Sequence, residues 1–201
     1  MRLFITRPSP FARKAWAAML ELGLESRVEL VTLPPRMPKV AKPDLEAINP
    51  LGKVPSLVTD DGTLIPDSRV IVRLFDEIAG GDLIPSGEDR WRALTLEALA
   101  DGCIEAGIVL RVESLKDQAK QDPDEVVAYT GKIERAFDYI ESRPDLLEYD
   151  FNIGQLTLAC VADWLVFREI MPDPVPNRPA IAARLAALRE RPSLLATRPT
   201  L

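Results

Sequence analysis

Residues 54–65 read VPSLVTDDGTLI, and this stretch decides the fold of the first part of the chain. Two short apolar runs, 57–59 and 63–65, lie on either side of Asp60-Asp61-Gly62. An Asp-Gly pair between apolar runs is typical of a β-hairpin. The stretch therefore predicts two antiparallel strands, which the chain enters through Val54-Pro55.

The segments around this hairpin complete an α/β pattern. Upstream, residues 3–5 and 28–33 are apolar in the manner of strands, and residues 11–22 repeat apolar side chains at helical spacing. Downstream, residues 70–78 trace one apolar helical face. The order β-α-β, a linking segment, then β-β-α predicts a four-stranded mixed sheet with helices packed on it. The linking segment is rich in proline and predicts an exposed basic loop with a short helix near residues 45–48.

The second half of the chain shows no strand pattern. Helical patterns cover residues 89–121, 124–142, 152–168 and 178–191. The third of these is apolar almost all round, so we expect it to be central and buried, with Asn152 and Gln155 at its capped start. The predicted class is α+β: an N-terminal domain at 1–80, a linker at 81–88 and an all-helical domain at 89–201.

The composition excludes several classes of function. The chain has 201 residues and no histidine, which excludes Ser-His-Asp and Cys-His triads and any imidazole base. A net charge of -6 argues against nucleic-acid or anionic-membrane binding. The two cysteines match no metal motif, and no apolar run approaches the ~20 residues that span a bilayer. We expect a cytoplasmic protein without a metal.

Three short segments carry polar groups suited to chemistry: residues 9–14, 49–57 and 66–68. Each has a simpler interpretation, because Ser9 and Asp67 are good helix N-caps and Pro55 suits the entry to a strand. In the predicted topology, however, two helix N-termini and the turn before the hairpin meet at one sheet edge. Helix N-termini attract thiolates and carboxylates, so this edge suits a small anionic thiol peptide.

These segments resemble the cytosolic glutathione transferase family over essentially the whole chain. Residues 49–55 are similar to its most recognisable stretch, Asp67-Ser68 to its glutathione motif, and Ser9-Pro10-Phe11 to the first helix of its serine-type members. Residues 152–155 fall where the family has a capping box, with Gln155 in place of the usual Asp. The resemblance implies a thioredoxin-like N-terminal domain, a helical C-terminal domain and a homodimer.

The same resemblance implies roles for individual residues toward glutathione. Val54 pairs through its backbone with the cysteinyl part, and Pro55 follows a cis peptide bond. Asp67 takes the γ-glutamyl amino group, Ser68 takes the α-carboxylate, and Ser9 lies at the sulfur with Phe11 beside it. One of the loop cations Arg36, Lys39 and Lys42 meets the glycyl carboxylate, unless all three are simply solvated.

The activity that the resemblance implies is conjugation in detoxification. Ser9 stabilises the glutathione thiolate, which is added to a small, hydrophobic electrophile, with glutathione as co-substrate and no metal. Serine at this position cannot form the mixed disulfide that cysteine supports. Two alternatives stay open: a glutathione-dependent isomerase, dehalogenase or peroxidase, and a non-catalytic binding or regulatory protein of the same fold.

Overall fold

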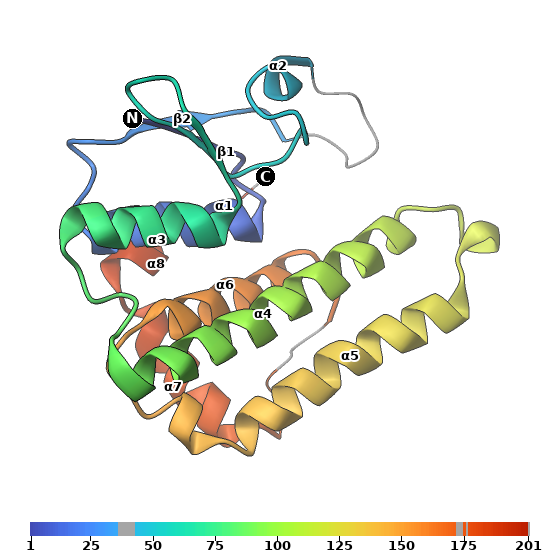
Figure 1. Cartoon of the computed structure of the whole chain (residues 1–201). Coiled ribbons are helices and arrows are strands. Elements are labelled where there is room, and N and C mark those ends of the chain that lie inside the picture. The colour runs from blue at the N-terminus through green and yellow to red at the C-terminus, as the bar shows by residue number, and fades with distance from the viewer. Residues whose placement is uncertain (36–42, 172–174, 176, 201) are drawn as a thin grey trace. The chain divides into compact units, whose positions relative to one another are not determined.

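The computed structural model describes residues 1–35, 43–171, 175 and 177–200. The chain divides into two compact units, Met1–Ile84 together with Pro192–Leu201, and Pro85–Arg191. Figure 1 shows the strands confined to the first unit, whereas the second is built of helices. The predicted α+β class is confirmed. No helix within the described ranges is long and apolar enough to cross a membrane.

The sheet of the first unit has four strands in the order β2-β1-β3-β4. The strands are β1 (Arg2–Ile5), β2 (Glu29–Thr32), β3 (Ser56–Val58) and β4 (Leu64–Pro66). β1 is parallel to β2 and antiparallel to β3, and β3 forms the predicted hairpin with β4. Gly62 takes a φ of +86° in the hairpin turn, a value that favours glycine. The predicted mixed sheet is therefore confirmed.

Two helices cover one face of this sheet (Figure 1). They are α1 (Pro10–Glu21) and α3 (Ser68–Ala79), and they pack against each other. Their shared core includes Leu3, Ala15, Leu57 and Phe75, all fully buried. The short helix α2 (Pro43–Glu46) follows the undescribed segment. Both α1 and α3 therefore begin at the sheet edge where β1 and β4 end.

The end of the chain belongs to the first unit. Helix α8 (Pro192–Ala196) packs on α1, where Arg13 Nη2 donates to the Leu194 carbonyl at 3.2 Å. The domain boundaries at 1–80 and 89–201, which come from sequence alone, stay a prediction. Contacts nevertheless group residues 192–201 with the sheet, because a local pattern does not reveal a contact made 181 residues away.

The helical unit is arranged around one buried helix. Its elements are α4 (Gly87–Ser114), η1 (Gln118–Lys120), α5 (Pro123–Glu141), η2 (Pro144–Leu146), α6 (Ile153–Phe167) and α7 (Pro179–Arg189). Twelve residues of α6 are buried, and the helix packs on α4 and α7. Asn152 Oδ1 accepts from the N–H groups of Gly154 and Gln155, as an N-cap does. The expected central, capped helix is present.

Candidate functional site

The strand register brings the three predicted segments to one edge of the sheet. Phe4 of β1 lies opposite Ser56 of β3, and Ser56 lies opposite Pro66 of β4. The residue before Ser56 is Pro55, and the residue after Pro66 is Asp67. Since β1 ends at this edge and α1 begins soon after it, Ser9 belongs to the same edge. Residues distant in sequence thus converge at one site.

Ser9 begins α1 as its N-cap. Its Oγ accepts a hydrogen bond from the Ala12 N–H at 3.2 Å, and its backbone N–H donates to the Thr6 carbonyl at 3.2 Å. Pro10 follows at the first helical position, where its missing N–H costs nothing. Because the Ser9 oxygen acts as an acceptor toward Ala12, its O–H takes no part in the cap. Phe11 follows, half-buried.

The loop that carries Val54-Pro55 is held by a buried asparagine. The side chain of Asn49 is 1% exposed, and its Nδ2 donates to the Lys53 carbonyl at 3.1 Å and to Ser56 Oγ at 2.9 Å. Asn49 Oδ1 accepts from the Leu51 N–H at 2.9 Å. Because the buried amide uses both its NH2 donor group and its oxygen acceptor, it holds the loop in one conformation. No such role was predicted for Asn49 from the sequence.

Val54 offers its backbone at this edge. The Val54–Pro55 peptide bond is cis, as the resemblance implies. Val54 is half-buried, and within the described part of the chain its N–H and C=O meet no hydrogen-bond partner. A backbone donor and acceptor left open on an extended residue suit an incoming peptide, as in strand addition.

Asp67 caps α3 in an unusual backbone conformation. Its φ of 70° lies in a region that costs a residue other than glycine about 1–3 kcal/mol. Its Oδ1 accepts from the Arg69 N–H at 2.8 Å, and the Arg69 guanidinium spans both carboxylate oxygens at 3.1 and 3.0 Å. Sequence reasoning missed this ion pair, although an acid two residues before an arginine at a helix start was a usable signal.

The charges around Asp67 keep it ionised. Hydrogen bonding from the Arg69 side chain is the main cause that lowers the pKa of Asp67, and the positive charge of Lys14 adds to it. Lys14 is fully buried in α1. Ser68, the first residue of α3, is 3% exposed, and its N–H meets no hydrogen-bond partner among the described residues. The edge therefore pairs a carboxylate with an open helix N-terminus.

The structure gives no position for the loop cations predicted to meet the glycyl carboxylate. The loop cations Arg36, Lys39 and Lys42 lie outside the described residues. Within the described ranges, no group of three Cys, Asp or Glu side chains is placed to hold a metal.

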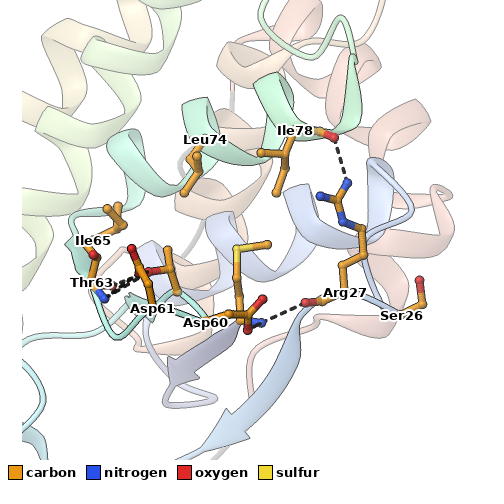
Figure 2. Close-up of a pocket in the computed structure, with 10 residues that line it drawn as sticks. Ser26, Arg27, Asp60, Asp61, Thr63, Ile65, Leu74 and Ile78 are labelled. Carbon is orange, nitrogen blue, oxygen red and sulfur yellow. Dashed lines mark hydrogen bonds and ion pairs between the residues drawn. The ribbon is translucent and has the colours of Figure 1, made fainter.

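A separate hollow lies at the opposite end of the strands, beside the hairpin turn (Figure 2). The N-terminal ammonium of Met1 pairs there with Asp60 at 2.7 Å, and Arg27 Nη1 donates to the Ile78 carbonyl at 2.9 Å. Figure 2 shows Leu74 and Ile78 of α3 facing this hollow. None of the predicted site residues lines it. Asp61 accepts hydrogen bonds from the Thr59 hydroxyl and the Thr63 N–H, so each of these charged groups already has a partner within the protein.

Neither cysteine has the surroundings of a reactive thiol. Cys103 is 2% exposed and Cys160 is fully buried, and neither forms a disulfide. Burial raises the pKa of the Cys103 thiol to about 12, so almost no thiolate exists at neutral pH.

We expect neither cysteine of the native protein to react with an aryl disulfide or a maleimide within minutes. After unfolding, both cysteines should react, and an aryl disulfide should release two equivalents of aryl thiolate per chain. Rapid stoichiometric labelling of the native protein would contradict this expectation.

Comparisons with known proteins show the family of the chain. Residues 8–78 match the family model of the glutathione S-transferase N-terminal domain. The uncharacterised GST-like protein YibF of Escherichia coli K12 is 32% identical over 204 residues, covering 99% of this chain and 98% of YibF. The chain belongs to the glutathione S-transferase family. Its N-terminal unit is accordingly thioredoxin-like.

Solved structures of this family show the same fold. A member from Pseudomonas fluorescens Pf-5 with bound glutathione is 36% identical, with a TM-score of 0.93, covering 100% of this chain and 99% of that one. A second structure of a Pf-5 member, with bound S-(propanoic acid)-glutathione, is 35% identical with a TM-score of 0.89 and complete coverage of both chains. A Methylobacterium radiotolerans transferase in complex with glutathione sulfonate is 27% identical with a TM-score of 0.86, covering 100% and 95%.

Proposed function

We propose that this protein is a glutathione transferase that activates the thiol of glutathione and adds it to a small electrophile. The observation that carries the proposal is the convergence of Ser9, Val54 and Asp67 at one sheet edge, where two helices begin. Relatives that are 36% and 27% identical bind glutathione and glutathione sulfonate. The reaction belongs to the cytoplasm, and detoxification is the role it suits.

Each group at the edge has a partner in glutathione. The open N–H and C=O of Val54 pair with the cysteinyl unit, and Pro55 shapes the turn beside it. The Asp67 carboxylate takes the γ-glutamyl ammonium, while the Ser68 hydroxyl and N–H take the α-carboxylate at the N-terminus of α3. Phe11 lies next to Ser9 along α1, close to the sulfur.

The chemistry rests on a hydrogen bond to the sulfur. The Ser9 O–H, which is not used in the cap, donates to the thiolate and lowers the pKa of the glutathione thiol from about 8.5. The thiol proton passes to solvent. The sulfur then forms a bond to the electrophilic carbon, and the leaving group departs with its electron pair. No step requires histidine, which the chain lacks.

Two other activities fit the same family. A regulatory protein of this fold that binds no glutathione has no need for a strained, ionised Asp67 next to an open helix N-terminus, so the geometry favours a protein that binds glutathione. Isomerase, dehalogenase and peroxidase reactions use the same activated thiolate, and product analysis separates them from conjugation. A relative that holds S-(propanoic acid)-glutathione carries a thioether of the kind that conjugation produces.

Asp67→Asn tests the glutathione site. Asparagine keeps the N-cap and tolerates a positive φ, but it lacks the charge that pairs with the glutamyl ammonium. We expect glutathione to bind about tenfold more weakly or worse, since a charge-assisted hydrogen bond contributes about 1.5–3 kcal/mol. Titration calorimetry measures this, with Asp82→Asn, at an exposed acid of the same unit, as the control. If Asp67→Asn bound glutathione as tightly as the wild type, Asp67 would not be the partner of the γ-glutamyl ammonium.

We also propose that the protein is a homodimer in which one N-terminal unit meets the partner's helical unit. Each unit has a large exposed apolar side chain, Val70 at 50% on α3 and Trp91 at 69% on α4. We expect sedimentation to give twice the chain mass of 22.3 kDa, and Trp91→Ser to shift the protein toward the monomer. Val127→Ser, at a 72% exposed residue of α5, is the matched control. A monomeric wild-type protein at micromolar concentration would refute the dimer.

A further inference from the structure

The peptide unit that joins Lys53 to Val54 is anchored from one side. The Lys53 carbonyl accepts two hydrogen bonds, from Asn49 Nδ2 at 3.1 Å and from Ser56 Oγ at 2.8 Å. Asn49 Nδ2 also donates to Ser56 Oγ at 2.9 Å, so the three groups are bonded to one another in a ring. Asn49 is 1% exposed and Ser56 is fully buried. The Lys53 carbonyl therefore points toward the interior of the sheet unit.

The planarity of the peptide makes this anchor set the direction of the Val54 N–H. In a trans peptide the C=O and N–H bonds point to opposite sides. The cis bond of this loop is at Val54–Pro55, and the Lys53–Val54 bond is trans. Because the Lys53 carbonyl points inward, the Val54 N–H points outward, where it meets no hydrogen-bond partner in the described part of the chain. Two buried polar side chains thus orient one exposed backbone donor.

Asn49 is itself held at every polar group. Its backbone N–H donates to the Leu45 carbonyl at 2.7 Å, and its carbonyl accepts from the Gly52 N–H at 2.7 Å. Its side-chain Oδ1 accepts from the Leu51 N–H at 2.9 Å. Gly52 takes a φ of +57°, and a Cβ there would meet Glu46 Cγ at 3.3 Å, so the turn suits glycine. The amide that anchors the Lys53 carbonyl is therefore fixed before any ligand arrives.

We propose that Asn49 and Ser56 are positioning residues that orient the Val54 N–H toward the carbonyl of the cysteinyl unit of glutathione. This inference rests on the proposed function, in which the open backbone of Val54 pairs with that unit. Because both side chains are buried, they act on glutathione only through the Lys53–Val54 peptide. A donor that is already oriented needs little ordering on binding, so the pair increases affinity and helps to place the sulfur at Ser9.

A matched pair of thiols tests the contact with the cysteinyl carbonyl. γ-Glutamylcysteine amide keeps this carbonyl, whereas γ-glutamylcysteamine lacks the whole carboxamide group. Neither thiol carries the glycyl carboxylate, so the loop cations do not enter the comparison. We expect the wild-type protein to bind the amide about tenfold more tightly than the cysteamine thiol, as one well-placed hydrogen bond allows. Titration calorimetry measures both thiols, with glutathione in the same series.

Two substitutions weaken the anchor in different ways. Ser56→Ala removes the hydroxyl donor to the Lys53 carbonyl. Asn49→Asp removes both amide N–H donors but keeps an oxygen that can accept from the Leu51 N–H. We expect each variant to bind the amide about fivefold to tenfold more weakly, and the cysteamine thiol within about twofold of the wild type. Should Asn49→Asp not fold, Ser56→Ala decides the question alone.

The controls separate orientation of the donor from stability of the unit. Ser56→Thr keeps the hydroxyl and should keep the preference for the amide. Val28→Ala creates a cavity at a residue that is 3% exposed, next to the start of β2 and at the opposite end of the strands from Pro55. It should lower the Tm and leave the ratio of the two affinities unchanged.

Each outcome bears on the positioning role or on the proposed function. Equal weakening for both thiols in the Asn49 and Ser56 variants shows a role in stability alone and overturns the inference. Folded variants that keep the wild-type preference overturn it too, as does a wild-type protein that binds glutathione but does not distinguish the two thiols. If the wild-type protein binds no glutathione, the proposed function fails, and the positioning role fails with it.

Discussion

Replacing Ser9 by alanine is expected to lower kcat/KM for glutathione conjugation about 100-fold at pH 6.5. Removing one preorganised hydrogen-bond donor that stabilises an anion in an active site usually lowers the rate by about this factor. Without the Ser9 O–H, the pKa of the bound thiol rises toward the ordinary value of about 8.5. The thiolate is the reactive form, so the deficit should shrink as the pH is raised past that value. A pH–rate profile between 6 and 10 measures both quantities.

The control must separate the hydroxyl from the helix cap, because Ser9 Oγ also accepts from the Ala12 N–H. Loss of an N-cap costs about 1 kcal/mol of stability, whereas glycine at the same position costs only a few tenths. Ser9→Gly should therefore fold like the wild type and share the kinetic deficit, and Ser9→Thr should keep activity. Asp122→Ala removes the cap of α5 and should leave the thiol pKa unchanged. A Ser9→Ala enzyme with full activity at pH 6.5 would remove Ser9 from the mechanism.

The elements of the fold were predictable where the signal is local. The pair Asp61-Gly62 marked the hairpin, and the absence of strand patterns after residue 80 marked the helical unit. Boundaries were less certain: the helix expected to end at residue 121 ends at Ser114, after which η1 and the cap of α5 follow. There the buried Glu113 accepts from the Asp122 N–H and pairs with Lys116. Such a tertiary bond is invisible in a helical repeat.

The candidate site was predictable in its backbone elements and not in its side-chain partners. Ser9, Val54 and Asp67 stand at turns and helix starts, which a sequence marks with proline and capping residues. The pairing of Asp67 with Arg69, and the clamp that Asn49 forms, depend on rotamers and burial instead. Gln155 gives a further case, because its amide donates to the carbonyls of Leu147 and Tyr149, which a simple capping pattern does not indicate.

Gly154→Ala is expected to destabilise the helical unit by about 2 kcal/mol or more, near the upper part of the usual range for overpacking. The added Cβ would lie 2.5 Å from the Ala93 carbonyl oxygen and 2.7 Å from Leu96 Cβ. A backbone carbonyl in a helix cannot rotate away as a flexible side chain can, so α4 and α6 must separate. Since α6 is the buried centre of the unit, that separation disturbs packing along both helices. Thermal unfolding followed by circular dichroism should show a Tm lowered by several degrees.

The opposite sign is expected for Gly102→Ala, which provides the control. Gly102 lies in the same helix α4, is exposed, and would place a Cβ with no atom within 4 Å. Alanine there gains helix propensity and should stabilise the unit by up to about 1 kcal/mol. The two substitutions make the same chemical change, so their difference isolates the contact between α4 and α6. If Gly154→Ala were as stable as Gly102→Ala, the close approach of α4 and α6 at Gly154 would be wrong.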